Sequence, residues 1–181
     1  MHHFILQTVK FMKKTFFLLF LALLGGATSG FGQSDKAQRS SPSAQAKAIV
    51  NGKIITIDYS QPAVKGRKIW GDLVPYGLTW RTGANETTVF EVSADVLIEG
   101  KKLAKGPYAL FTIPGEKEWV VIFNKTIAWG EYSYKEADDV LRVTVPSKPS
   151  SSFTERFSIN ISDQGLVSLL WEDLQVDFTV K

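Results

Sequence analysis

The stretch AKAIVNGKIITIDY, residues Ala46–Tyr59, places a small or apolar residue at every second position on both sides of an Asn51-Gly52 pair. This alternation is typical of a strand with one buried face, because successive side chains of a strand point to opposite faces. Asn-Gly is the strongest short signal for a hairpin, since both central positions of a type I′ turn need a positive φ. The stretch therefore predicts two antiparallel strands joined by a tight turn.

Short segments of the same kind follow at regular spacing, with turn residues such as Glu99-Gly100 and Asp163-Gln164-Gly165 between them. They are Thr87–Ser93, Val96–Ile98, Lys101–Leu103, Pro107–Ile113, Trp119–Asn124, Val140–Val145, Phe153–Ser162, Leu166–Trp171 and Leu174–Val180. About nine or ten strands with little helix predict an all-β domain. We expect an antiparallel β-sandwich of jelly-roll-like form.

Some segments carry more specific expectations. Trp119–Asn124 is apolar on both faces, which predicts a central strand. Ser147–Ser152 has the composition of a loop, and Glu131–Asp139 is the one place where a short helical turn is expected. In the strand at Phe153–Ser162, we expect the inward residues to be Phe153, Phe157, Ile159 and Ile161.

The N-terminus has the pattern of a secretory signal peptide. Lys13-Lys14 precedes the apolar run Phe16–Leu24, and small residues follow up to Gly32. The run is too short to cross a bilayer, which takes about 20 residues. We expect translation to start at Met12, residues 1–32 to be removed, residues 33–44 to form a flexible polar tether, and residues 45–181 to form one domain. The predicted location is the periplasm or the outside of the cell, with no membrane anchor after cleavage.

Composition excludes several kinds of chemistry. The chain has no cysteine, and its two histidines, His2 and His3, lie in the leader. Catalysis by Ser-His-Asp or Cys-His groups is therefore excluded for the mature chain. The glutamine-dependent amide transfer of an asparagine synthetase is also excluded, because it needs an N-terminal cysteine as nucleophile. A zinc site is not expected either, and we predict no metal and no cofactor, although an all-oxygen Ca²⁺ site stays open.

The formal charge of +3 belongs to the precursor. The leader holds three of the 21 basic residues and no acidic one, so that removing it leaves 18 basic residues against 18 acidic ones. A neutral domain has no general electrostatic attraction for nucleic acid or for anionic membranes. We therefore predict no nucleic-acid partner.

The long segment Pro62–Glu86 is the most informative part of the chain for function. It is rich in glycine and aromatic residues and follows no regular period, and loops of this length in compact domains are commonly functional. Within it, Arg81 could hold an anion or a sugar through its guanidinium, and Asn85 and Glu86 add polar atoms. Trp70 and Trp80 are candidate stacking surfaces. The structural alternative is that Arg81 pairs internally and pins the loop to the sandwich.

Other residues allow both a functional and a structural interpretation. Arg67 lies in the cationic turn Val64–Lys68, which is either an anion-binding turn or a solvated one. Asp58 and Glu86, before and after the long loop, are the pair of acids that a glycan hydrolase would require. Asp138-Asp139 is expected to cap the entry to a strand. Among the tryptophans, Trp119 and Trp171 are assigned to the core, and the exposed candidates are Trp70 and Trp129.

Three long stretches resemble a bacterial family known as a domain of unknown function, number 2911. They are IDYSQPAVKGRKIWGDLVPYGLTWRTGANE (Ile57–Glu86), GKKLAKGPYALFTIPGEKEWVVIFNK (Gly100–Lys125) and WGEYSYKEADDVLRV (Trp129–Val143). The resemblance covers nearly the whole mature chain. It implies a secreted or periplasmic β-rich protein, and it implies no activity.

Three functions remain open at this point. The first is a non-catalytic binding module for a glycan or a small anionic ligand, with Trp70, Trp80, Arg81, Asn85, Glu86, Arg67 and Asp58 as candidate site residues. The second is an enzyme that uses carboxylates alone, such as a glycan hydrolase. The third is a structural envelope protein whose partner is another protein.

Overall fold

Seven strands form one antiparallel sheet in the computed structural model, which describes residues 39–181. The sheet has the order β1-β2-β3-β6-β7-β8-β9, and β4 and β5 form a separate hairpin. The strands are β1 (Ser43–Val50), β2 (Lys53–Ser60), β3 (Val89–Val92), β4 (Val96–Ile98), β5 (Lys101–Leu103), β6 (Gly106–Ile113), β7 (Glu118–Asn124), β8 (Asp139–Ile161) and β9 (Leu166–Thr179). The predicted signal peptide, the start at Met12 and residues 33–38 of the predicted tether lie outside the described residues.

The all-β prediction is confirmed. Within residues 39–181 the only helical pieces are two 3₁₀ turns, η2 (Glu131–Ser133) and η3 (Glu136–Asp138), which fall in the segment where a helical turn was expected. No helix in this part of the chain has the length and apolar character needed to cross a membrane.

The hairpin predicted around Asn51-Gly52 is present. Both residues have a positive φ, 50° and 78°, and Val50 pairs with Lys53 across the turn. The alternation places Ala46, Ala48, Val50, Ile55, Ile57 and Tyr59 in the core. Glu99-Gly100 forms a turn with the same signs of φ between β4 and β5.

The first strand starts slightly earlier than expected. β1 begins at Ser43, inside the predicted tether of residues 33–44. The residues just before it are held as well, because the Gln61 amide donates to the Pro42 carbonyl (2.9 Å) and Arg156 donates to the Ser40 carbonyl (3.2 Å). Polar composition marked this segment as flexible, whereas hydrogen bonds to its backbone carbonyls hold its last residues against the domain.

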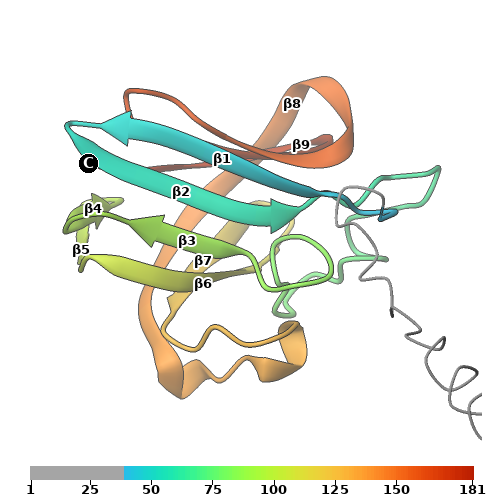
Figure 1. Cartoon of the computed structure of the whole chain (residues 1–181). Coiled ribbons are helices and arrows are strands. Elements are labelled where there is room, and N and C mark those ends of the chain that lie inside the picture. Colours follow the sequence, from blue (N-terminus) through green and yellow to red (C-terminus); the bar gives the residue numbers. More distant parts are fainter. Residues whose placement is uncertain (1–38) are drawn as a thin grey trace, which may run out of the picture. The chain divides into compact units, whose positions relative to one another are not determined.

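β8 closes the structure by changing partners. Its first part pairs with β7 as far as Pro146, and from Ser147 onward it pairs with β9. The loop predicted at Ser147–Ser152 is therefore wrong, since these residues lie within the strand. The sheet curls, and β8 returns beside β1 (Figure 1).

The irregular pairing of β8 also shifts its alternation. The register of the pair β8–β9 changes between Pro149 and Thr154 and again before Ser158. Phe157 and Ile159 are buried as predicted, but Phe153 is 61% exposed. The prediction that Phe153 faces inward is wrong because a strict two-residue period does not continue through a bulged strand.

Aromatic residues join the two sides of the curled sheet. Phe178 on β9 packs against Phe90 on β3 and Phe123 on β7, with ring centroids 6.3 and 6.0 Å apart. Tyr59 on β2 packs edge-on against Phe157, and its hydroxyl accepts a hydrogen bond from the Ile159 amide (3.0 Å). Burial raises the pKa of Tyr59. The result is a sandwich-like fold around one main core.

A smaller apolar cluster lies on the opposite face of β6 and β7. Ala109, Phe111 and Ile122 are fully buried there, and Tyr134 from the segment 125–138 packs edge-on against Phe111 at 5.1 Å. The prediction that β7 is apolar on both faces and central is thereby confirmed. The segment 125–138 covers this face.

The jelly-roll form is not confirmed. Along the seven-stranded sheet, each strand lies beside its neighbour in sequence, apart from the inserted β4–β5 hairpin. A jelly roll needs the long crossing connections of two Greek keys. The described strands instead form a meander that curls on itself.

The turn before β9 gives a direct test of this architecture. Gly165 has φ +84° and its carbonyl accepts a hydrogen bond from the Val180 amide (2.7 Å), and a Cβ added there would overlap the Val180 carbonyl oxygen. We expect Gly165→Ala to lower the free energy of unfolding by about 2 kcal/mol or more beyond the effect of Gly100→Ala, because overpacking typically costs about 1–3 kcal/mol.

Gly100 is the matched control because it has nearly the same φ (+79°) and nothing within 4 Å of an added Cβ. Urea unfolding followed by tryptophan fluorescence measures both variants. Equal losses in the two variants would contradict the close contact between Gly165 and Val180.

Candidate functional site

The long segment Pro62–Glu86 forms much of the wall of a cavity of about 590 Å³. Cationic and aromatic side chains line it together, namely Lys65, Arg67, Arg81, Trp80, Trp129 and Trp171. Ser40, Ser41 and Asn85 add polar groups, and Leu73 and Val74 add apolar ones. None of the described residues in the lining is acidic.

The structure brings four of the seven candidate residues together. Arg67, Trp80, Arg81 and Asn85 all line this cavity. Asp58 and Glu86 line a second cavity of about 360 Å³, together with Tyr59 and Thr87. Trp70 lines neither of these cavities.

The prediction that Trp70 is an exposed stacking surface is wrong. Its side chain is 7% exposed, because the apolar pair Ile69-Trp70 turns into the core and leaves Gly71 at the surface. Trp129 is 68% exposed, as predicted, and Trp119 and Trp171 are core residues, as predicted. Sequence alone gave no signal that Trp171 also lines the cavity.

Four tryptophans form a contiguous cluster beneath the cavity. The Trp70 ring lies 5.9 Å from Trp80, 5.0 Å from Trp119 and 5.7 Å from Trp171, each in an edge-to-face arrangement. Trp80 stacks on Trp171 at 5.8 Å with an interplanar angle of 15°. Two of the four come from the long loop, one from β7 and one from β9, so the cluster ties the loop to the sheet.

Three indole N–H groups of this cluster are buried without an acceptor. Trp80 donates to the Gly83 carbonyl (3.2 Å), whereas the Nε1 atoms of Trp70, Trp119 and Trp171 have no hydrogen-bond partner among residues 39–181. A buried donor without an acceptor is costly, and it commonly marks the place of a water molecule or a ligand. Of the three, only Trp171 lines the cavity.

Local hydrogen bonds shape the wall around Arg81. Its Nη1 donates to the Asn85 carbonyl (3.2 Å), and the Asn85 amide group donates to the Ser41 carbonyl (2.9 Å). Glu86 accepts two hydrogen bonds from Arg39, at 2.8 and 3.0 Å. Asn85 has φ 58°, a conformation that asparagine tolerates better than most residues.

The cationic turn Val64–Lys68 already holds a carboxylate. The Lys65 amide donates to the Glu155 side chain (2.9 Å), and the Val64 amide donates to the Glu155 carbonyl (2.8 Å). Arg67 bends back and donates to the carbonyls of Ala63 and Val64. The backbone of this turn therefore binds Glu155, while the Lys65 side chain extends into solvent beside the cavity.

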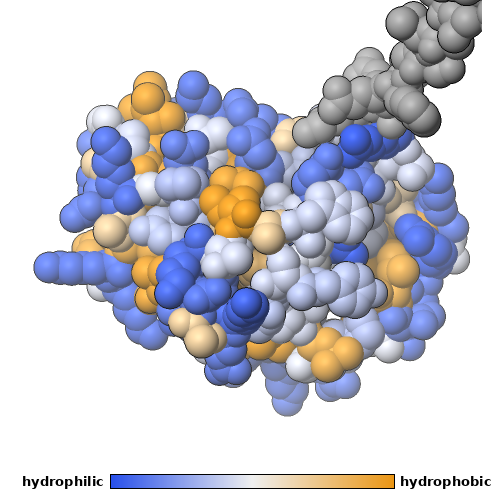
Figure 2. Space-filling model, turned by 60° about the horizontal axis from the view of Figure 1, so that its bottom comes forward, coloured by the Kyte–Doolittle hydropathy of each residue, from blue (hydrophilic) through white to orange (hydrophobic). Residues whose placement is uncertain are grey.

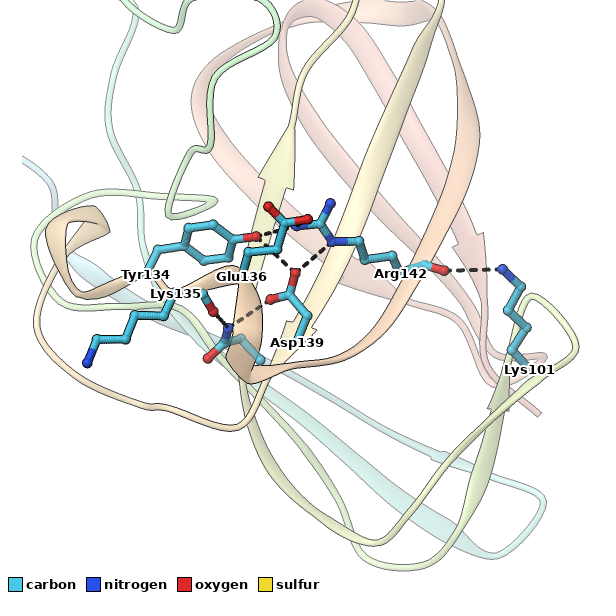
Figure 3. A network of polar contacts seen from close by, with 7 residues as sticks. Lys101, Tyr134, Lys135, Glu136, Asp139 and Arg142 are labelled. Atoms are coloured by element: carbon cyan, nitrogen blue, oxygen red, sulfur yellow. Dashed lines mark hydrogen bonds and ion pairs between the residues drawn. The ribbon is translucent and has the colours of Figure 1, made fainter.

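Trp129 is held at the edge of the cavity by its own loop, which a polar network anchors at the entry to β8 (Figure 3). Asp139 accepts hydrogen bonds from Arg142 (2.6 Å), Tyr134 (2.9 Å) and Asn124 (2.8 Å). At the same place Asp138 accepts a hydrogen bond from Thr126 (2.7 Å), which lowers its pKa. The Asp138-Asp139 pair thus fixes the loop.

A metal site does not emerge from this geometry. Within residues 39–181 there is no group of three or more acidic side chains placed to hold an ion. The chemistry that the first cavity offers is donation of hydrogen bonds, positive charge and an aromatic surface.

Burial raises the pKa of Tyr134 to about 12, with the Asp139 hydrogen bond and charge adding to the effect. The neutral phenol is therefore favoured in the folded protein. The contribution of Tyr134 to the free energy of unfolding is complete below pH 10, and it is lost as the pH rises toward 12, because the unfolded chain gives up its phenol proton first. We expect Tyr134→Phe to lose less stability than wild type between pH 9 and pH 12, as measured by urea unfolding.

Tyr132→Phe is the matched control, since Tyr132 is on the same loop and is 91% exposed. A wild-type pH dependence that Tyr134→Phe leaves unchanged would contradict the proposed environment of Tyr134.

The comparisons with known proteins give a family and no activity. The sequence profile of a family described as "Protein of unknown function (DUF2911)" matches residues 41–180. No curated protein and no solved structure matches the chain significantly. The match spans β1 to β9, including the long loop and the segment that carries Trp129, and the chain is therefore a member of the DUF2911 family.

Proposed function

We propose that this domain is a non-catalytic binding module that holds a glycan or a small anionic ligand in the first cavity. The observation that carries the proposal is the lining, which combines Lys65, Arg67 and Arg81 with no acidic residue among those described. Three cations around one hollow attract an anion, and the partly buried position of Arg81 reduces the screening of that attraction by water.

The size and the chemistry of the cavity fit a small organic ligand. A volume of about 590 Å³ lies within the range of about 300–1,000 Å³ that is typical of small-molecule sites. Trp129 offers an exposed ring, and Leu73 and Val74 offer apolar contacts. The ligand would therefore carry both charge and a nonpolar surface.

The leader supports a role for this module outside the cytoplasm. A positive pair of lysines followed by a short apolar run is the pattern of an export signal. We place the module in the periplasm or outside the cell, where its ligand would be an envelope glycan or a small anionic metabolite. We do not propose a nucleic acid as a ligand or partner.

An enzyme that uses carboxylates is the alternative from another class. It is favoured by one observation, which is that Asp58 and Glu86 line the same second cavity. Against it, Asp58 accepts a hydrogen bond from Gln45 (2.7 Å), and Glu86 is paired with Arg39 (2.8 Å). A general acid of a glycosidase must hold a proton, and an arginine partner favours the charged carboxylate.

Hydrolysis assays separate the two functions. The enzyme alternative requires turnover of a glycan by wild type and its loss in both Asp58→Asn and Glu86→Gln. The binding module predicts no turnover, and it predicts that both variants still bind ligand in the first cavity.

A structural role through a protein partner has less support. Figure 2 shows one face of the molecule, on which hydrophobic residues lie in separate spots between hydrophilic ones. Partner surfaces are more commonly marked by a contiguous apolar patch. This face does not favour the third function.

Lys65 provides the test of the anionic ligand. Its exposed side chain lines the cavity, and its removal leaves the core untouched. We expect Lys65→Gln to weaken binding of anionic ligands by about two- to fivefold, the range for an exposed charge pair, and we expect added salt to weaken wild-type binding. Calorimetric titration measures both effects.

Lys102→Gln is the matched control, because Lys102 is an exposed lysine on β5 that does not line the cavity. Equal effects of the two substitutions would show that only the overall charge matters, and this would contradict a site at the first cavity. The absence of binding to any glycan or anion in the titration would remove the proposed function itself.

A further inference from the structure

The first cavity has three features that together narrow its ligand to one chemical class. One is an exposed aromatic ring, one is a guanidinium on the adjoining part of the wall, and one is a group of hydroxyl and amide side chains. Each feature recognises a different part of a molecule.

Trp129 and Arg81 lie on neighbouring pieces of the wall. A Cβ added to Gly130, the residue after Trp129, would lie 3.7 Å from Nη1 of Arg81. The loop thus passes within van der Waals distance of the guanidinium, and the φ of +72° at Gly130 is a conformation that favours glycine. Thr87 donates a hydrogen bond to the Ala128 carbonyl and so also holds this loop.

The position of Trp129 suits a ligand that has a face of C–H groups. Its side chain is 68% exposed although it lines the cavity, so a ring that stacks on it would remove apolar surface from water. Tyr132 is on the same loop and is 91% exposed, but it does not line the cavity. The contrast marks Trp129 as the stacking residue.

Polar groups of the wall suit hydroxyls next to the charge. Ser40 and Ser41 contribute hydroxyls, and Oδ1 of Asn85 accepts no hydrogen bond from the described residues. A ligand with several oxygens supplies partners for these groups of the wall.

We propose that the cavity binds an acidic sugar, whose ring stacks on Trp129 and whose carboxylate lies at Arg81. The inference rests on the proposed binding function and adds the class of ligand and the division of roles. A carboxylate matches the planar fork of an arginine in two parallel hydrogen bonds. The pyranose face supplies the C–H groups for the indole, and the sugar hydroxyls meet Ser40, Ser41 and Asn85.

The test compares three probes on the purified protein, with binding followed by NMR chemical-shift titration. Galacturonic acid carries both the ring and the carboxylate, galactose carries the ring alone, and acetate carries the carboxylate alone. We expect galacturonic acid to bind at least about tenfold more tightly than either of the other two, since both groups contribute.

Variants assign the roles. We expect Trp129→Ala to weaken the binding of galacturonic acid about tenfold and to leave acetate binding unchanged, because the sugar loses its stacking surface whereas acetate has no ring to stack. Trp129→Phe should restore part of the affinity, and Tyr132→Ala is the matched control that should have no effect. Arg81→Lys keeps the charge and should weaken galacturonic acid and acetate alike, because it removes the fork.

The outcomes separate this inference from the proposed function. If acetate binds as tightly as galacturonic acid and Trp129→Ala changes neither, the acidic sugar is overturned while anion binding stands. If galactose binds as tightly as galacturonic acid, the role of the carboxylate is overturned while glycan binding stands. If no glycan or anion binds to a protein whose thermal unfolding shows it to be folded, both proposals fail.

Discussion

The packing of Trp70, Trp80, Trp119 and Trp171 is the interaction on which the rest of the structure depends. A segment of 25 residues without regular secondary structure would cost much conformational entropy to order, and backbone hydrogen bonds alone compensate little of it. Two large rings of the long loop enter the core and meet one ring each from β7 and β9. Burial of these rings makes the loop part of the fold, so its outer residues can form a fixed cavity wall.

The same packing links the fold to recognition. Stacking of Trp80 on Trp171 forms the floor of the cavity, and the turn that follows Trp80 carries Arg81 to the wall. The second wall, with Trp129, is fixed independently by Asp139 and its partners at the entry to β8. Because both walls of the cavity are fixed, the guanidinium of Arg81 and the ring of Trp129 are held at a constant distance and orientation. Discrimination between similar ligands requires such a fixed arrangement.

Local patterns predicted what depends on local physics. The turns at Asn51-Gly52 and Glu99-Gly100, the buried faces of the early strands and the exposed Trp129 all follow from turn chemistry and alternation. Features that depend on distant pairing were missed. Ser147–Ser152 has loop composition but lies within β8, because β8 pairs with β9 from Ser147 onward. Trp70 is buried by rings that include Trp171, 101 positions away in sequence. The split of Asp58 and Glu86 from Arg81 into separate cavities depends on the path of the long loop, which has no period to reveal it.

Amide hydrogen exchange of the wild-type protein tests the central claim most directly. In the long loop, the amides of Val64, Val74 and Trp80 donate hydrogen bonds of 2.8, 2.9 and 2.7 Å to backbone carbonyls. If the tryptophan cluster makes the loop part of the core, these amides exchange only through global unfolding, with the same protection as Val121 in β7. Exchange of the three amides a thousandfold or more faster than that of the Val121 amide would contradict the account. It would mean that the opening free energy of the loop is about 4 kcal/mol lower than that of the sheet, so that the cavity wall opens independently of the sheet.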